Sequence, residues 1–462
     1  MSDAFKRTAL GLVGFCPELT QGTPNWKFVA NGGSGTTATL DTGGAQHNAA
    51  LAAMGDDFLN ELWIYFKSDT TTSALRGKCY RISDSARSTT TVTLTTPSAM
   101  AASPASGDVF YVFAPIKASE VQVTPATENL ARTFERQTLD APSSLKGLKT
   151  CSGSFKLELE GLEQENGNGD TPRPDRLSRF LECIGDRRSV AGTTVSGGSS
   201  TTTQVDVTSA ASLQAGDLVM ISGEIRRVTA TNTAATPDNI TVSPPLSAAP
   251  ADTTEVFVAE TYTPADTGHR SHTMLFLRDT QLTEVRGCVF SVSVEASFGQ
   301  PAMLSCEFDA GLWDMEDTFT LDGQQSTKKA IPYIQGESHF GTTEICTNSL
   351  NFALGHGRQQ LRDTCENASF YVTSRDSTCQ VVFRNKDAVP KETWEGAGTF
   401  DYLLCAVGNA AAAAAAICGK AQIQDPASAS DVEGHQYWDA TFGLKDDQTD
   451  YATPTKPVLA RF

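Results

Sequence analysis

Few residues in this chain have the types and spacing that chemistry requires. Among the six histidines, His269 and His272 are spaced as two metal ligands could be, although a strand or surface pair is the simpler interpretation. The segment EQENGNGD, residues 163–170, places carboxylate and amide oxygens close together, but it lacks the alternating acidic register and the terminal glutamate of a calcium loop. We therefore expect no metal site and no cofactor.

The sequence also lacks a recognisable nucleophile. The glycine-rich stretch GGSGT, residues 32–36, misses the last glycine of a G-x-S-x-G elbow and has no lysine to hold a phosphate. Carboxylate pairs are frequent, as in any acidic protein, and none stands out as a general acid and base. We expect the protein not to be an enzyme. A glycan-cleaving enzyme, which needs two carboxylates at a fixed separation in a cleft, stays as an alternative.

The composition is typical of a soluble protein rich in strands. The 462 residues allow two to four domains, 39% of them are hydrophobic, and Ser, Thr, Gly and Ala are abundant while helix-forming Glu and Lys runs are scarce. The net charge of -18 argues against binding to a nucleic-acid backbone, which requires a basic surface. An acidic wall would instead repel nucleic acid.

The eleven cysteines form no metal-binding or disulfide pattern. Their number is odd and no C-x-x-C pair occurs, so we expect reduced thiols in a protein made in a cytosol. Residues 9–16, after Lys6 and Arg7, resemble a secretion signal, but Phe15 stands where a small residue is required before a lipidated cysteine. No apolar run approaches the roughly 20 residues of a membrane span, so we expect no membrane partner.

Two regions alternate strictly between apolar and polar residues. Residues 283–311 predict a hairpin of two long strands around Gly299, and residues 147–161 predict a third strand of the same kind. The apolar positions are Phe155, Leu157, Leu159, Phe290, Val292, Val294, Cys306 and Phe308. The polar positions are Ser154, Lys156, Glu158, Glu160, Ser291, Ser293, Glu295, Glu307 and Asp309. Such a sheet packs one face on a core and exposes the other to water.

Two segments, residues 30–115 and 195–261, resemble each other. In both, a Thr-rich strand is followed by an apolar strand and then by an aligned pair, Arg81-Ile82 or Arg227-Val228. A strand beginning Thr-Val, an Ala-Pro turn and a final Val-Phe strand complete each segment. Each therefore predicts a small β-barrel or sandwich of five short strands, and we interpret the two as duplicated insertions.

One helix is predicted outside these segments, over residues 171–186, with Pro174 near its start and Gly185 at its end. Its apolar stripe, spaced to pack on a sheet, consists of Leu177, Phe180, Leu181 and Ile184. The seven alanines 410–416, between Gly408 and Gly419, predict a short helix or a close-packed turn. The rest of the chain is predicted to form strands.

Taken in order, these segments resemble the major tail tube proteins of long-tailed bacteriophages. PELTQGTP (17–24) is similar to the family's arm, LSRFLECIGD (177–186) to its helix, and YTPADTGHRSHTMLFLRD (262–279) to the strand after it. RGCVFSVSVEASFGQPAMLSCEFDAG (286–311) resembles the hairpin whose sheet closes into the tube. NSLNFALG (348–355), FYVTSRD (370–376) and HQYWDATFGLKDD (435–447) resemble later strands, so the resemblance covers most of the chain outside the two insertions.

The resemblance implies a mainly β fold of tail-tube sandwich or barrel domains with a packed helix, and a structural role in the virion tail after synthesis in the host cytoplasm. Copies of the chain would form stacked rings, and DNA would pass through the lumen without specific binding. The tape measure protein and proteins at the tail ends are the other implied partners. Because a lumen that conducts DNA should be hydrophilic and negative, the nine polar positions above become candidates for lining it. The alternative is a solvated sheet face.

The expected organisation follows from these segments. It comprises an N-terminal arm (1–29), inserted module 1 (30–115), a first part of the tube core (116–194), inserted module 2 (195–261), a second part of the core (262–325) and a second tube-like β domain (326–462). Two tube-like halves predict rings of three chains with pseudo-sixfold symmetry; a hexamer is the alternative. A surface-exposed carbohydrate-binding or adhesive protein is a further alternative, and it would need aromatic platforms such as Trp63, Tyr65 and Tyr80.

Overall fold

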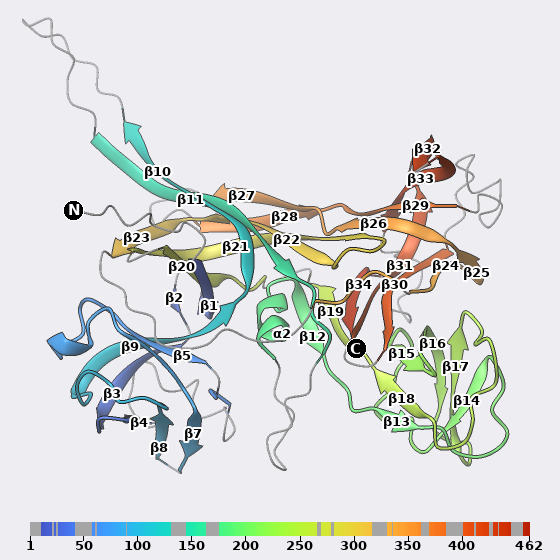
Figure 1. Ribbon diagram of the computed structural model, residues 1–462, viewed down its shortest axis with the longest axis horizontal. Coiled ribbons are helices and arrows are strands. Elements are labelled where there is room, and N and C mark those ends of the chain that lie inside the picture. Colours follow the sequence, from blue (N-terminus) through green and yellow to red (C-terminus); the bar gives the residue numbers. More distant parts are fainter. Residues whose placement is uncertain are drawn as a thin grey trace, which may run out of the picture.

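Antiparallel strands dominate the computed structural model, so the mainly β class predicted from the sequence is confirmed (Figure 1). The structure describes residues 11–20, 23–24, 26–41, 58–60, 62–88, 90–130, 145–162, 175–265, 269–278, 281–316, 330–334, 336–361, 369–384, 401–410, 413–424, 428–432, 434–444 and 456–462. Most of its strands join one hydrogen-bonded network, and a separate six-stranded sheet and a two-stranded ribbon accompany it.

The predicted hairpin is confirmed as strands β21 (Gln281–Ser297) and β22 (Met303–Ala310), which pair with Val292 opposite Cys306. Gly299 lies in the turn between them with φ of +81°, a conformation that glycine adopts without strain. The third predicted strand, β11 (Leu145–Glu158), pairs with β22 on one side and with β10 (Ala118–Leu130) on the other. The N-terminal part of β21 pairs with β20 (His272–Arg278) and β23 (Leu312–Glu316) in a second layer.

Within the segment expected to form an N-terminal arm (1–29), residues 11–20 lie in the body of the protein. Strand β1 (Gly11–Thr20) pairs with β20 and with the end of β9 (Ser106–Ile116), and a short β2 (Thr23–Pro24) follows it. Val13 and Phe15 are buried, so the sequence of this segment suits a core strand rather than a projecting arm.

The second half of the chain extends the same sheet. Strand β26 (Thr347–Ala353) pairs with the C-terminal part of β21, and β29 (Ser377–Phe383) and β33 (His435–Leu444) follow it in the sheet. The remaining strands of this half are β24 (Ser338–Phe340), β25 (Thr343–Ile345), β27 (His356–Leu361), β28 (Ser369–Arg375), β30 (Asp401–Ala410), β31 (Ala413–Ile423), β32 (Ser428–Val432) and β34 (Val458–Arg461).

The two halves repeat one pattern of strand pairing. In the first half the pairs are β1–β9, β1–β20, β20–β21, β21–β22, β11–β22, β10–β11 and β21–β23. Their counterparts in the second half, in the same order, are β24–β25, β24–β30, β30–β31, β31–β33, β29–β33, β26–β29 and β31–β34. The chain therefore contains two structurally related units side by side in one sheet.

The two inserted modules share a topology as well. Their first strands begin at Lys27 and Thr193, slightly before the predicted starts at residues 30 and 195, and their described parts contain seven and six strands rather than the five predicted for each. Module 1 contains β3 (Lys27–Gly33), β4 (Thr37–Asp41), β5 (Trp63–Phe66), a 3-10 turn η1 (Ser73–Leu75), β6 (Cys79–Arg81), β7 (Asp84–Arg87), β8 (Thr91–Thr95) and β9. Module 2 contains β13 (Thr193–Thr194), β14 (Gln204–Val207), β15 (Leu218–Ile221), β16 (Glu224–Asn232), β17 (Asp238–Ser243) and β18 (Glu255–Val258).

Five pairings of module 1, namely β3–β9, β4–β8, β5–β6, β5–β9 and β7–β8, recur in module 2 as β13–β18, β14–β17, β15–β16, β15–β18 and β16–β17. The modules differ in their cores. Module 2 has a hydrophobic cluster of its own, whereas the buried residues of module 1, among them Phe28, Ile64 and Phe110, belong to the cluster that fills the central fold.

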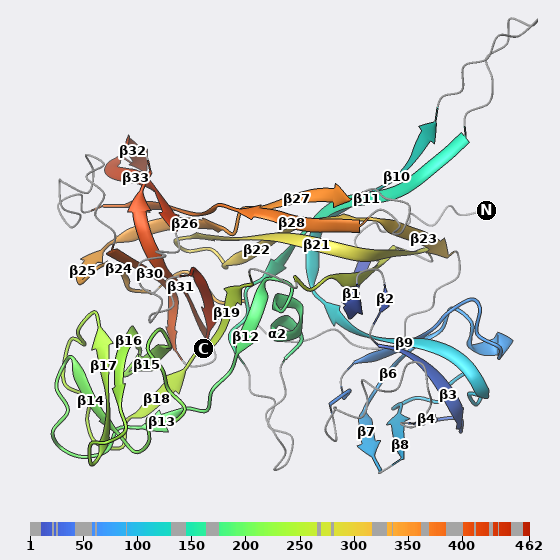
Figure 2. The same ribbon diagram turned by 180° about the vertical axis from the view of Figure 1, so that it is seen from behind.

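Both modules lie on the same side of the long sheet. Figures 1 and 2 show β10, β11, β21, β22, β26, β27 and β28 along one side of the molecule, with module 1 and module 2 at the two ends of the opposite side. Helix α2 (Arg176–Leu181) lies between the modules, beneath the sheet. Strands β12 (Gly185–Arg188) and β19 (Glu260–Pro264), which flank module 2 in the sequence, pair with each other in the central fold.

The helix is shorter than the sequence predicts. It begins after Asp175, whose side chain accepts a hydrogen bond from the Ser178 N–H at 2.6 Å, and it ends at Leu181. The prediction to residue 186 is wrong because Gly185 already starts β12, where a Cβ would meet the Thr263 carbonyl oxygen of the paired strand. Leu177, Phe180 and Leu181 are buried on the helix, and Ile184 is buried just beyond it.

A short helix over the alanines 410–416 is not formed, because Ala410 ends β30 and residues 413–416 belong to strand β31; residues 411–412, where a turn was the other prediction, lie outside the described residues. Ala414 and Ala416 face module 2, and Ala415 faces the central core, so both faces of the strand are buried. Small side chains allow packed layers to approach on both faces at once. This tertiary packing overrides the helix propensity of alanine.

The C-terminal strand is fastened to the helix by a buried ion pair. Arg461 is fully buried and donates to both Asp175 carboxylate oxygens, at 3.1 and 2.8 Å, and to the Ser178 hydroxyl at 3.0 Å. Its other donors reach the carbonyl oxygens of Glu160 at 2.8 Å and Gly161 at 2.9 Å, just after β11. Burial lowers the pKa of Arg461, but Asp175, Tyr262 and Glu260 together raise it above its usual value, so the guanidinium stays charged.

Replacing Arg461 by alanine should destabilise the protein by about 3–5 kcal/mol, because Asp175 would be left as a buried, unpaired charge. Urea unfolding of the full chain measures the loss. Arg87→Ala, at an exposed position, is the matched control and should change the unfolding midpoint little. Equal midpoints for the two variants would contradict this account of the ion pair.

Candidate functional site

One face of the sheet carries a row that crosses six strands and is polar except for Met303. Glu158 of β11 lies opposite Met303 of β22, which lies opposite Glu295 of β21. The row continues through Asn351 of β26 and Gln380 of β29 to Thr441 of β33. A neighbouring row contains Lys156, Ser305, Ser293, Ala353, Thr378 and Gly443. We call this surface the polar face.

The opposite face of the same strands is a continuous apolar row. It consists of Leu157, Leu304, Val294, Phe352, Cys379 and Phe442, all buried. Farther along the strands, Phe155 and Phe290 contact the helix, with their ring centroids 5.8 and 5.3 Å from that of Phe180. The helix thus supports the sheet from behind and leaves the polar face free of α2 and of both modules.

The structure brings eight of the nine predicted lumen candidates together. Ser154, Glu307 and Ser291 are aligned across β11, β22 and β21, and the other five lie in adjacent positions of the same face: Lys156, Glu158, Ser293, Glu295 and Asp309. Glu160 lies beyond the end of β11, where it forms a bridge to Ala330 and an ion pair with Lys117 at 3.6 Å. It is therefore at the margin of the polar face.

Basic residues on the polar face are held between carboxylates. Lys156 Nζ lies 3.1 Å from Glu120 and 3.9 Å from Glu295. The pKa of Lys156 is raised by its hydrogen bond to Glu120 and by the charge of Glu295, so the ammonium is retained at neutral pH. Arg358 in turn contacts Asp309 at 2.9 Å and Glu307 at 3.5 Å. The positive groups are neutralised locally, which leaves no basic patch for a phosphate backbone among these residues.

A two-stranded ribbon, β27–β28, lies beside this part of the face (Figure 1). It continues the β26–β29 hairpin through a kink at Gly355, where φ is +62° and a Cβ would meet the Asp376 carbonyl oxygen at 2.0 Å. His356 Nδ1 lies 3.1 Å from the Phe290 carbonyl oxygen, and Arg358 donates to the Glu307 carbonyl oxygen at 2.7 Å. The ribbon is therefore attached to β21 and β22.

Sequence reasoning expected the second half to contribute strands to the wall but named none of its residues for the polar face. Asn351, Gln380 and Thr441 occupy the far end of the first row, and Gln380 donates to the Asp439 carboxylate at 2.9 and 3.0 Å. The signal was present, because the apolar and polar residues of these strands alternate as they do in the first half. The alternation identifies a face within each strand, but only the long-range pairing shows that these faces join.

The residues considered for metal binding are not brought together. The ring nitrogens of His272 lie 2.7 Å from the Ser271 carbonyl oxygen and 3.1 Å from that of Phe180, whereas the ring of His269 packs 5.7 Å from that of His356. In the part of the chain that the structure describes, no group of three or more His, Cys, Asp or Glu residues could hold a metal ion. The segment 163–170 lies outside the described residues.

The aromatic residues named for a carbohydrate-binding surface are buried. Trp63 and Tyr65 have no exposed side-chain surface, and Tyr80 is 6% exposed with its hydroxyl accepting from the Ala101 N–H at 2.8 Å. Trp63 and Tyr65 belong to a buried cluster shared with β20 and β21, and Tyr80 belongs to the central cluster. A sugar that stacks on an aromatic face would need other residues.

Comparison with known proteins does not assign this chain to a family. No model of a known protein family and no curated protein matches this chain. Within the described residues, no helix is long and apolar enough to cross a membrane. The functional argument therefore rests on the polar face and on the arrangement of strands behind it.

The buried His272 makes the stability of this arrangement depend on pH. Its ring stacks on Phe15 at 5.2 Å, and burial lowers its pKa to about 4. The unfolded state, with an ordinary histidine pKa near 6.5, binds more protons between pH 6.5 and 4, so stability should fall as the pH falls through that window. The contribution of His272 should reach about 3 kcal/mol at the acidic end.

Urea unfolding of the protein and of His272→Gln at pH 7.5 and 4.5 measures this contribution. The loss between the two pH values should be smaller in the variant, because glutamine does not titrate. His339 and His356 also have pKa values lowered by burial, so the difference between the two proteins, rather than the total slope, is the relevant quantity. Equal losses would refute the assignment to His272.

Proposed function

We propose that this chain is a structural subunit of a long-tailed bacteriophage, whose copies assemble into stacked rings that form the tail tube and conduct DNA. The observation that carries the proposal is the single sheet formed by both halves, with a polar face on one side and the helix and both modules on the other. Such a subunit can line a channel with one side and bear its additional domains outside. The other expected partners are the tape measure protein and the proteins at the tail ends.

The edges of the sheet support self-assembly. Among the described strands, β10 pairs with β11 alone and β32 pairs with β33 alone, so the first and second halves each end in a strand with one edge not used within the chain. Open edges are sites for the addition of another strand, and a closed barrel removes them. The C-terminal part of β21 already receives β26 in this way where the two halves meet. We propose that β10 of a second copy continues the sheet beyond β32.

The repeated pairing pattern supports three chains in each ring. If every half is one tube unit, three chains supply six units related by pseudo-sixfold symmetry. The junction between the halves of one chain then has the same arrangement as the junction between neighbouring chains. A ring of six chains would need one of the two halves to leave the tube wall, although both contribute to the same polar face.

The charges of the polar face suit a channel for DNA. Glu158, Glu295 and Glu307 are at least partly exposed, while Lys156 and Arg358 are occupied by carboxylates. A wall of this kind repels phosphates at distances up to about one Debye length, roughly 8–10 Å at physiological salt. DNA would therefore pass without adhering to the wall.

Purified protein should assemble into rings or tubes that contain three chains in each ring. Native mass measurement of isolated rings, together with the symmetry of their projections down the axis in electron microscopy, tests both parts. Thr124→Asp and Ala126→Asp, at exposed positions of β10, should prevent assembly by placing charges on the edge strand, while Thr208→Asp on module 2 should not. Monomers under all conditions would contradict the proposed function, and six chains in each ring would contradict the three-chain arrangement.

Reversing charge on the polar face should impair DNA passage without preventing assembly. We expect Glu158→Lys combined with Glu295→Lys to give tubes of normal appearance in virions that deliver DNA more slowly, because phosphates would be attracted to the wall. Glu158→Gln with Glu295→Gln is the matched control that removes charge without reversing it, and its effect should be smaller. Normal delivery by the lysine variant would show that this face does not line the channel.

A further inference from the structure

Each inserted module buries one face of its sheet against a hairpin of the central fold. In module 1, the buried cluster joins Trp63 and Tyr65 of β5 and Tyr111 and Phe113 of β9 to the β20–β21 hairpin through Leu275, Leu277 and Leu282. In module 2, it joins Leu218 and Met220 of β15 and Ile225 of β16 to the β30–β31 hairpin through Leu404, Ala406, Ala414, Ala416 and Cys418. Both hairpins thus have their outer face covered.

The docking residues occupy matching positions in the two modules. Tyr65 lies opposite Cys79 in the β5–β6 pair, as Met220 lies opposite Ile225 in the β15–β16 pair. Trp63 lies opposite Arg81, as Leu218 lies opposite Arg227, which are the arginines aligned by the sequence comparison. The hairpins that receive the modules, β20–β21 and β30–β31, are also counterparts in the repeated pattern of the halves.

The strand that follows module 2 lies close to the hairpin that receives the module. Module 2 is inserted between β12 and β19, and β19 pairs with β34, which pairs with β31 of the second half. Module 1 is inserted in the first half and docks there. The attachment of module 2 through β19 therefore brings it beside the second half, and the matching docking residues show that the contact itself is repeated.

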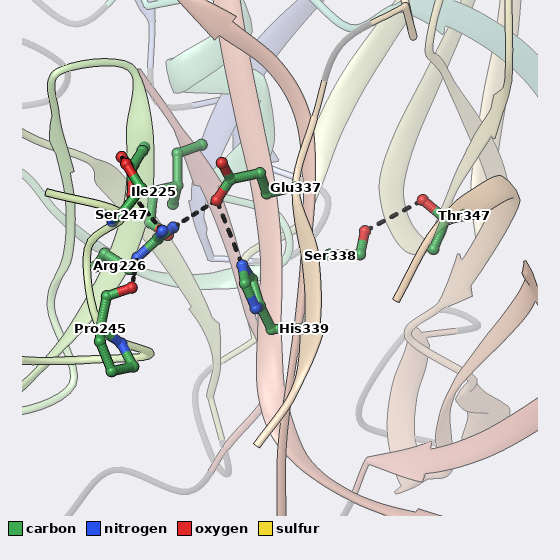
Figure 3. Close-up of polar contacts among 9 residues, drawn as sticks. Ile225, Arg226, Pro245, Ser247, Glu337, Ser338, His339 and Thr347 are labelled. Atoms are coloured by element: carbon green, nitrogen blue, oxygen red, sulfur yellow. Dashed lines mark hydrogen bonds and ion pairs between the residues drawn. The ribbon is translucent and has the colours of Figure 1, made fainter. Parts of the chain in front are cut away.

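A polar network accompanies the apolar contact (Figure 3). Arg226 of module 2 is 2% exposed and donates to Glu337 Oε2 at 2.8 Å, just before β24, and to the Pro245 carbonyl oxygen at 3.1 Å. Glu224 also binds Arg226, and His339 Nε2 lies 3.4 Å from Glu337 Oε2. Burial would raise the pKa of Glu337, but Arg226 outweighs it and lowers the pKa, so the carboxylate stays ionised.

A second basic residue stacks across the same contact. The guanidinium of Arg227 lies 3.8 Å from the centroid of the Tyr402 ring on β30, at cation–π distance. The turn between β15 and β16 approaches β30 closely as well, since a Cβ at Gly223 would lie 3.1 Å from the Asn409 carbonyl oxygen. Module 1 has a corresponding charged contact, because Lys67 Nζ lies 2.9 Å from Glu284 Oε2 of β21. Each contact therefore combines an apolar centre with an ion pair in which at least one partner is buried, Arg226 in module 2 and Glu284 beside module 1.

We infer that module 2 is the counterpart of module 1 for the second half, and that its β15–β16 face is a specific docking surface for the β30–β31 hairpin. The chain is then two copies of one building unit, each a half of the sheet with a module docked by the same face. In a ring of three chains, six modules would occupy equivalent positions on the outer surface. The statement about the ring rests on the proposed function, whereas the docking surface does not.

Hydrogen exchange of the full chain, followed by mass spectrometry, tests the docking surface. Met220 belongs to the contact cluster and not to the core of module 2, so Met220→Asp should undock the module without unfolding it. We expect faster exchange in β30 and β31 while β14 and β17 stay protected. Gln204→Asp, at an exposed position on β14, is the matched control and should leave exchange in β30 and β31 unchanged.

Arg227→Ala provides a second variant that touches neither core. It removes the stacking on Tyr402 and should give a smaller increase of exchange in the same strands. If Met220→Asp unfolds module 2 itself, the Arg227 variant alone tests whether the docking surface is specific. The inference would be overturned if exchange in β30 and β31 were as slow as in the unchanged protein. This holds for the Arg227 variant and for a Met220 variant that is folded.

The projection of assembled rings down their axis tests the equivalence of the modules. Six outer lobes in each three-chain ring are expected, and three lobes, or six lobes of two alternating radii, would overturn it. If no rings form, the proposed function fails, and the exchange experiment still decides whether the docking surface is specific.

Discussion

The buried pair of Arg461 and Asp175 fixes the point where three distant segments meet. Arg461 has five N–H donors, and the acceptors come from the end of β11, the first turn of α2 and Asp175 itself, so the C-terminal strand, the helix and the central sheet are fastened together. Burying a charge is costly, and such a pair often stabilises less than apolar packing would. Its effect here is positional: it holds α2 so that Phe180 supports the sheet from behind, and it holds β34 between β31 and β19.

The same strand register determines the core and the polar face. Leu157, Val294 and Phe442 align on the buried side because Glu158, Glu295 and Thr441 align one residue away on the other side. Since side chains alternate with a period of two, a slip of one residue would bury the carboxylates and expose the apolar row. The high cost of burying those carboxylates selects one register, so the surface proposed to line a channel and the core that stabilises it are specified together.

Sequence reasoning succeeded where the determinants are local. The alternation of β11, β21 and β22 depends on neighbouring residues and gave correct strands. The similarity of the two modules gave their shared topology, although not the number of their strands. Sequence reasoning failed where long-range pairing decides: Gly185 ends the helix region because it pairs with β19, and the alanines form a strand because both of their faces are packed. The repeat of the two halves is expressed in strand pairing rather than in matching residues. In the counterpart strand pairs, Phe155 of β11 lies opposite Cys306 of β22, whereas Cys379 of β29 lies opposite Phe442 of β33.

In the first building unit the module and the half of the sheet share one hydrophobic core, whereas in the second they have separate cores. This difference explains why their docking surfaces differ in composition. Phe28, Ile64 and Phe110 of module 1 belong to the central cluster, so module 1 continues the core of the first half. Its contact with the β20–β21 hairpin buries further large aromatic rings. Module 2 encloses its own core, so the contact with the second half needs only to cover a flat, alanine-rich face. Small side chains gain little from burial alone. Orientation of module 2 therefore depends on directional contacts, which Arg226 with Glu337 and Arg227 with Tyr402 supply.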